Sequence, residues 1–84
     1  MAGRKKENEE LVFEIVREIG VLSEGKNGWS KQVNIVKWGD SESKLDIRSW
    51  NEDRSKMSKG ITLDYEETQI LKNILNEKED ELDF

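Results

Sequence analysis

The chain has 84 residues, of which 39% are charged and 33% hydrophobic, so a single small domain with a modest core is expected. It contains neither cysteine nor histidine, which excludes a disulfide framework and a zinc site of the Cys/His type. The net charge is −5, but residues 26–60 carry eight Lys/Arg against five Asp/Glu, so positive charge is concentrated in the middle of the chain.

Several classes of protein do not fit this composition. No stretch approaches the ~20 apolar residues of a membrane span, and residues 1–10 lack the apolar core of a signal peptide, so a soluble, cytoplasmic protein is expected. Without His or Cys the commonest general base and nucleophile are missing, and no glycine-rich phosphate loop is present. We therefore expect no enzyme, cofactor or metal site. A core this small is marginal alone, which favours a homodimer.

The chain begins with a charged, patternless segment, residues 1–10, for which a disordered arm is predicted. Residues 11–23, LVFEIVREIGVLS, fit a two-residue alternation and a helical period about equally well. Their β-branched content and the internal Gly20 favour a long strand, bulged at the glycine, over a helix. Residues 24–28, EGKNG, predict a turn, because Asn27-Gly28 is a strong hairpin signal.

Two alternating strands follow this turn. Residues 31–38 are expected to direct Val33 and Ile35 to one face, and Gln32, Asn34, Val36 and Trp38 to the other. After a polar turn at residues 39–43, residues 44–50 alternate cleanly. The positions expected to face the core are Leu45, Ile47 and Ser49, and those expected to face outward are Lys44, Asp46, Arg48 and Trp50.

A fourth strand and a helix complete the expected fold. After a turn at residues 51–55, residues 56–63 form the strand, with a bulge at Gly60 that turns Met57 and Lys59 outward. Asp64 and Glu67 predict a helix that begins at Tyr65, because they provide an N-cap and a reach-back acid. Its narrow apolar stripe comprises Thr68, Leu71, Ile74 and Leu75. The acidic tail, residues 77–84, is expected to fray. The predicted class is α+β, a curved four-stranded antiparallel sheet covered on one face by a C-terminal helix (ββββα), with the binding domain at residues 11–76.

The three tryptophans all lie in the basic middle of the chain. Rings set among cations on a sheet face suit an unpaired nucleic-acid strand, because bases stack on rings and phosphates meet cations. Trp50, beside Arg48 on outward positions, is the ring most strongly indicated, followed by Trp38. Trp29 fits stacking or packing at the hairpin equally well, and each lysine taken alone fits a solvated edge residue. The residues expected to bind nucleic acid are Trp29, Lys31, Lys37, Trp38, Lys44, Arg48, Trp50, Lys56, Met57, Lys59 and Gly60.

Residues 44–71, KLDIRSWNEDRSKMSKGITLDYEETQIL, resemble the signature of the transcriptional positive cofactor four family. The shared parts are a D-I-R strand followed by an aromatic residue, a turn, a K-G-I-[ST]-L strand and a helix. With the upstream GWSKQVNIVKW, the chain is more similar still to the bacterial YdbC-like branch of that family. The resemblance extends over about residues 13–75.

This resemblance implies a first segment that is a strand, a homodimer, and binding of single-stranded DNA with little sequence preference. It also implies that Arg48 and Trp50 take the places of the family's arginine and stacking aromatic, Trp38 that of the preceding aromatic, and Lys59-Gly60 that of the basic-glycine pair. The long serine- and lysine-rich tail of eukaryotic members has no counterpart here, so strand binding is expected rather than a coactivator role. RNA binding, or a protein-interaction and dimerisation module, remain alternatives.

Overall fold

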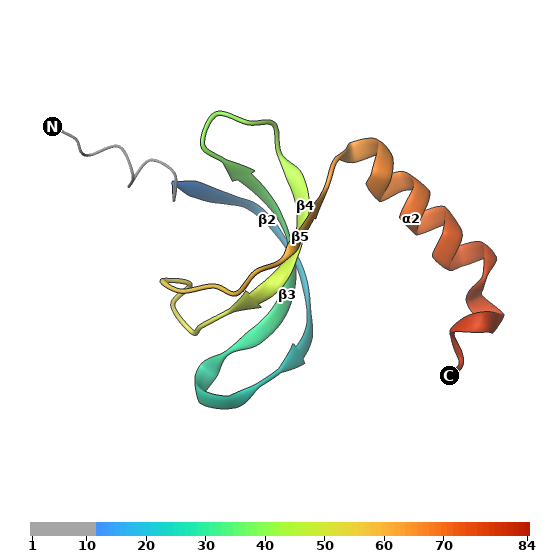
Figure 1. Ribbon diagram of the computed structural model, residues 1–84, viewed down its shortest axis with the longest axis horizontal. Coiled ribbons are helices and arrows are strands. Elements are labelled where there is room, and N and C mark those ends of the chain that lie inside the picture. The colour runs from blue at the N-terminus through green and yellow to red at the C-terminus, as the bar shows by residue number, and fades with distance from the viewer. Residues whose placement is uncertain (1–11) are drawn as a thin grey trace, which may run out of the picture.

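The computed structural model describes residues 12–84, so the predicted arm at residues 1–10 lies outside the described residues. It is a curved antiparallel sheet with a helix on its outer side (Figure 1). The strands, paired in chain order, are β2 (Phe13–Glu24), β3 (Ser30–Trp38), β4 (Lys44–Trp50) and β5 (Ile61–Leu63). The helix is α2 (Tyr65–Glu77), and two 3₁₀ helices are η1 (Lys26–Gly28) and η2 (Glu79–Leu82). This arrangement confirms the predicted four strands and one helix.

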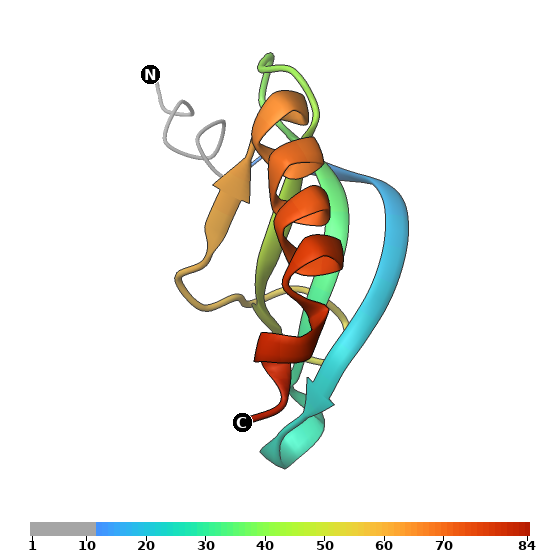
Figure 2. The same ribbon diagram turned by 90° about the vertical axis from the view of Figure 1, so that its right-hand side faces the viewer.

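The first strand, β2, settles the choice between strand and helix in favour of the strand. Its register against β3 shifts at three places, and the second shift, between Glu18 and Gly20, confirms the irregularity predicted at the glycine. Each shift leaves one extra residue on β2, and these residues are Val16, Ile19 and Leu22. Because a bulge bends and twists its strand, β2 curls along β3 and the whole sheet is strongly curved (Figures 1 and 2).

The hairpin between β2 and β3 turns at the predicted place. Asn27 and Gly28 have φ angles of 59° and 82°, and the Trp29 amide donates to the Lys26 carbonyl at 3.1 Å. Positive φ at both central residues is what a type I′ turn requires, and asparagine followed by glycine tolerates it best. The local sequence therefore fixes this turn.

The last strand is shorter than predicted. Only Ile61–Leu63 pair with β4 as a strand, and residues 56–60 belong to a connection that touches β4 through a single bridge between Trp50 and Met57. From that bridge to the Ile47–Ile61 pair, β4 advances three residues and the other chain segment four. This extra residue is consistent with the bulge predicted at Gly60. A Cβ at Gly60 would collide with the Arg48 side chain, so the close approach there requires glycine.

The face of the sheet that forms the core is the opposite of the one predicted. Even-numbered positions of β3 and β4 share one face, as alternation predicts, and this is the concave face. There Trp50 and Asp46 are fully buried, while Ile47, on the convex face, is only half-buried. The expectation that Asp46, Arg48 and Trp50 face solvent is therefore wrong. The sheet curls around its even-numbered side chains, so these form the core of the protomer.

The helix begins as predicted but covers the sheet only in part. Asp64 Oδ1 accepts from the Glu67 amide at 2.8 Å, and Glu67 Oε1 accepts from the Asp64 amide at 3.0 Å, which is a complete capping box. Figure 1 shows α2 standing away from the convex face. Of the predicted apolar stripe, Leu71 is half-buried, while Ile74 and Leu75 are exposed. Within the predicted acidic tail, η2 follows α2.

Candidate nucleic-acid interface

Three aromatic rings meet in the hollow of the sheet. The ring centroid of Phe13 lies 5.5 Å from that of Trp38 and 5.1 Å from that of Trp50, with tilted planes at both contacts. Phe13 and Trp38 are cross-strand partners on β2 and β3, whereas Trp50 comes from the far end of β4, so the curvature brings them together. Trp50 is fully buried, and Phe13 and Trp38 are half-buried. An open Trp50 ring was therefore a wrong expectation, and only Trp38 retains an accessible part.

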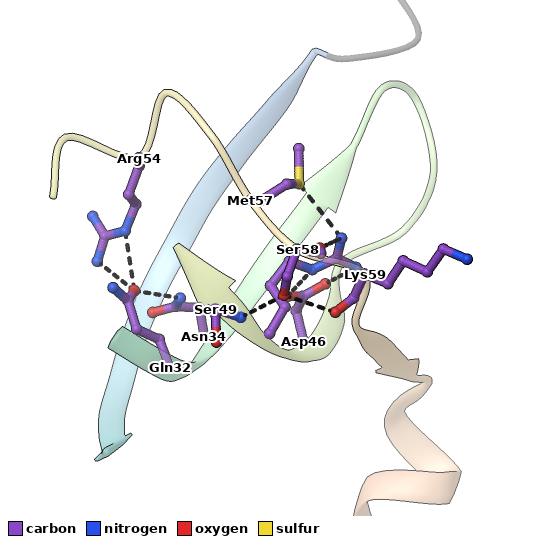
Figure 3. A network of polar contacts seen from close by, with 9 residues as sticks. Gln32, Asn34, Asp46, Ser49, Arg54, Met57, Ser58 and Lys59 are labelled. Carbon is purple, nitrogen blue, oxygen red and sulfur yellow. Dashed lines mark hydrogen bonds and ion pairs between the residues drawn. The ribbon is translucent and has the colours of Figure 1, made fainter. Parts of the chain in front are cut away.

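Arg48 lies next to this ring cluster and is held by a buried carboxylate. Its Nε donates to Asp46 Oδ1 at 2.7 Å and its Nη2 to Oδ2 at 2.8 Å, and Asp46 is completely buried (Figure 3). The guanidinium carbon lies 4.7 Å from the centroid of Trp38, within the range of a cation–π contact. Asp46 thus occupies two of the five N–H donors of the guanidinium, and Arg48 lies against the Trp38 ring.

A row of polar side chains continues from this pair along β3. Asn34 Nδ2 donates to Gln32 Oε1 at 3.1 Å, and Gln32 Nε2 donates to Ser30 Oγ at 2.9 Å. Gln32 Oε1 also accepts two bonds of 3.1 Å from Arg54 (Figure 3). Arg54 Nη2 lies 3.1 Å from Glu18 Oε2. Arg54 thus ties the β4–β5 connection to β3 and β2.

The first part of that connection, residues 51–56, is a compact turn with its own hydrogen bonds. Asn51 Oδ1 accepts from the Lys56 amide at 2.8 Å, and Asn51 Nδ2 donates to Ser55 Oγ at 3.0 Å. Asp53 Oδ1 accepts from the Ser55 amide at 3.0 Å. Hydrogen bonds from Ser55 lower the pKa of the Asp53 carboxyl below its usual value. Residues 51–56 are called the 51–56 turn below.

The predicted basic residues do not form a single surface. Lys31 and Lys37 occupy odd positions of β3 and lie on the convex face, opposite Trp38 and Arg48. Lys44 is on the concave face, where it pairs with Val36 and is half-buried. Lys59 is exposed and, together with Lys31 and Gly60, lines a pocket of about 380 Å³.

The remaining predicted residues lie around the β4–β5 connection. Lys56 is exposed at the end of the 51–56 turn, and Met57 Sδ lies 3.4 Å from Arg48 Nη1. Trp29 is half-buried at the hairpin and lines an open pocket of about 370 Å³ with Asn51. The structure thus brings Trp38, Arg48, Trp50 and Met57 together and leaves Trp29 and Lys37 apart from them. Lys31 lines the pocket at Lys59 and Gly60, which Arg48 also lines.

Sequence reasoning missed several residues of this region. Phe13 fits the alternation of the first strand, and this position could have marked it as a partner of Trp38 once the strand pairing was known. Asp46 lies two residues before Arg48, so alternation places both on one face and could have marked them as an ion pair. Arg54 gave no such signal, because its contacts depend on a turn in which it has a φ of 60°. Among residues 12–84, no group of three or more acidic side chains is placed to hold a metal ion.

Comparisons with known proteins agree with this architecture. The family described as Transcriptional Coactivator p15 (PC4) matches residues 26–74, which is more than half of the chain. The chain belongs to the PC4 family. A protein of Treponema pallidum (strain Nichols), described as an uncharacterized protein, is 41% identical over 69 residues, which are 82% of this chain and 81% of that protein. The PC4 family is a nucleic-acid-binding, non-enzymatic family that binds single-stranded DNA and functions in transcription.

The PC4 match spans the part of the chain that contains every predicted binding residue. It begins in the hairpin and includes β3, β4, the β4–β5 connection and most of α2. Phe13 and Glu18, which contact this region from β2, lie outside it. The assignment to a YdbC-like branch stays a prediction. Within residues 12–84, no helix is both long and apolar enough for a membrane crossing.

Proposed function

We propose that this protein binds single-stranded DNA with little sequence preference, through base stacking in the hollow of its sheet. The observation that carries the proposal is the half-buried ring of Trp38 in the PC4-matched region, whose orientation is fixed by contacts with the Phe13 ring and with the guanidinium of Arg48. A ring whose orientation is fixed in advance loses little conformational entropy when a base stacks on it. Each such stack contributes about 1–3 kcal/mol and accepts any base.

Phosphate contacts would come from the cations nearest the hollow. Lys44 lies on the concave face with Trp38, and Lys56 and Lys59 are exposed on the β4–β5 connection. The pairing of Arg48 with Asp46 leaves these lysines as the principal cations for the strand. Each phosphate neutralised on a single strand contributes about −0.7 to the slope of log K against log salt concentration. The affinity for the strand should therefore fall as the salt concentration rises. We expect such a protein to act on DNA in the cytoplasm, in replication, recombination, repair or transcription.

A titration with matched oligonucleotides tests the function. Labelled oligothymidine, the corresponding duplex and an oligouridine of equal length would be titrated with the protein at two salt concentrations, and fluorescence anisotropy recorded. We expect the single-stranded DNA to bind at least about tenfold more tightly than the duplex, because only unpaired bases offer a free face. Equal or tighter binding of oligouridine would favour an RNA-binding protein, and no binding at low salt would overturn the proposal.

We also propose that the protein is a homodimer, because one side of each protomer is left incomplete. The exposed fractions of Ile70, Ile74 and Leu75 on α2 are 58%, 49% and 43%, and Ile61 at the edge of the sheet is 54% exposed. Large apolar side chains exposed together on one helix are typical of an interface. A second copy would bury these residues and would add the core that a domain of this size lacks.

A further inference from the structure

Trp29 lies apart from the ring cluster, at the junction of two loops. The hairpin between β2 and β3 and the 51–56 turn both curl toward the concave side of the sheet, away from α2 (Figure 1). The two loops are in close contact at Gly28, where an added Cβ would lie 3.3 Å from Glu52 Oε1. Because Gly28 also has a φ of 82°, glycine both permits the turn and leaves room for the Glu52 side chain.

Trp29 and Glu52 line two open pockets at this junction. The first pocket, of about 370 Å³, is also lined by Glu24 and contains no Lys or Arg among its lining residues. The second, of about 380 Å³, is also lined by Asn27 and Lys56. Both volumes are in the range of small-molecule sites. A half-buried indole beside two carboxylates, with a lysine in the adjoining pocket, provides separate contacts for the base and the phosphate of one nucleotide.

The first pocket adjoins the face on which we propose that the strand binds. Its lining includes Ser30 and Gln32, which belong to the polar row along β3. At the other end of β3 lies Trp38, roughly 30 Å away along the strand by the usual rise per residue. A single strand that stacks a base on Trp38 and follows the polar row would therefore reach Trp29.

The carboxylates of the first pocket distinguish one base from the others. They accept hydrogen bonds and repel phosphate, so they suit a base edge that carries donors. Glu52 is exposed and has no hydrogen-bond or ion-pair partner within residues 12–84, whereas Asp53 accepts from the Ser55 amide. Guanine presents N1–H and N2–H side by side, and the two oxygens of one carboxylate can accept both. Adenine and cytosine present one amino group there, and the thymine N3–H lies between two carbonyls that a carboxylate repels.

We propose that the pocket at Trp29 is a guanine-preferring subsite, in which the base stacks on Trp29, Glu52 accepts from its N1–H and N2–H, and Lys56 meets the phosphate. The inference rests on the proposed function and deepens it, because it adds one position of base preference to a strand that is otherwise bound without regard to sequence. The subsite is held in place by the bonds from Arg54 to Gln32 and by the contact of Glu52 with the hairpin. Binding therefore requires little ordering of the loops.

Oligonucleotides that differ only in their bases test the subsite. Labelled oligothymidine and a strand of equal length with guanine at every third position, a spacing that avoids runs of guanine, would be titrated with the protein at one salt concentration, and fluorescence anisotropy recorded. We expect the guanine-containing strand to bind at least about fivefold more tightly, because a bidentate contact discriminates strongly between bases. With hypoxanthine in place of guanine, which lacks the N2 amino group, most of this gain should disappear.

Matched variants identify the groups that select the base. Glu52→Gln replaces one acceptor oxygen by a donor and should abolish the preference for guanine without weakening the binding of oligothymidine. Asp53→Asn makes the same change of charge at the next residue, which does not line the first pocket, and should retain the preference. Trp29→Ala should lose the preference, and Trp29→Phe, which keeps a stacking surface, should retain most of it.

The outcomes separate this inference from the proposed function. A preference for guanine that persists in Glu52→Gln, or that disappears equally in Asp53→Asn, would overturn the assignment to Glu52. Equal binding of the two strands by the wild-type protein would overturn the subsite while leaving the proposed function intact. Absence of binding to either strand would overturn both.

Discussion

The concave and convex faces of the sheet are built from alternate residues of the same strands, yet only one of them is complete in a single protomer. On the concave face, three rings fill the hollow, and the carboxylate of Asp46 is buried with Arg48 as its partner. On the convex face, α2 leaves Ile74 and Leu75 exposed. In the function that we propose, the concave face maintains the fold and binds the strand, and the convex face binds a second copy of the chain.

Of the changes considered, truncation of Trp50 on the concave face should have the largest effect, which is a loss of unfolding free energy. Trp50→Ala removes a fully buried ring that contacts Phe13, and such changes cost about 3–5 kcal/mol of unfolding free energy. Urea denaturation at a fixed protomer concentration would measure the loss. Trp29→Ala serves as the matched control, because Trp29 is half-buried at the hairpin and should cost less than half as much. Equal losses in the two variants would contradict the assignment of the core to the concave face.

A charge introduced on α2 should disrupt the proposed dimer interface on the convex face without unfolding the protomer. Ile74→Glu places a carboxylate in the proposed interface, where an unpaired charge is strongly disfavoured, and should weaken dimerisation by at least about a hundredfold. Sedimentation equilibrium over a range of concentrations would give the association constant. Lys72→Glu, which changes an exposed residue of the same helix, is the control and should leave the dimer intact. A wild-type protein that sediments as a monomer would show that the convex face is not a dimer interface.

How much of this comparison could be predicted from the sequence depends on the range of the interactions involved. Local signals predicted the turn at Asn27-Gly28, the capping box of Asp64 and Glu67, and the two-residue alternation, because each is decided within a few residues. Alternation separates two faces, but it does not say which one is inside. Since β3 carries apolar residues on both faces, that choice is made by the curvature that the three bulges of β2 impose.

The candidate site shows the same limit. Alternation places Trp38 and Arg48 on the same face, but the register pairs Arg48 with Gln32, six residues from Trp38 along β3, so their contact also depends on the curvature of the sheet. Alternation alone also separates Lys37 from Trp38, because adjacent residues of a strand point to opposite faces. The reach of Arg54 could not be predicted, since it depends on a contact with Gln32, 22 residues away along the chain. The partner of Asp46 is only two residues away, but its complete burial follows from the curvature of the sheet and not from that local pair.

Within the concave face, truncation of Trp38 should separate binding from stability. Trp38→Ala removes the ring available to a base and should weaken oligothymidine binding about tenfold, in line with the loss of one base stack. Trp38→Phe keeps a stacking surface and should retain most of the affinity. Anisotropy titrations of both variants, after thermal melts have confirmed that they are folded, would provide the measurement. Full affinity in Trp38→Ala would place the strand elsewhere on the molecule.

The smallest effect, and the sharpest test of which face binds DNA, comes from two lysines on opposite faces. Lys44 lies on the concave face and Lys37 on the convex one, and both are held in regular strands. Lys44→Ala should weaken oligothymidine binding a few-fold and reduce the magnitude of the salt slope by about 0.7, because one phosphate contact is lost. Lys37→Ala should change neither quantity. The reverse result would place the phosphates on the convex face, where the same surface could not also be covered by a second protomer.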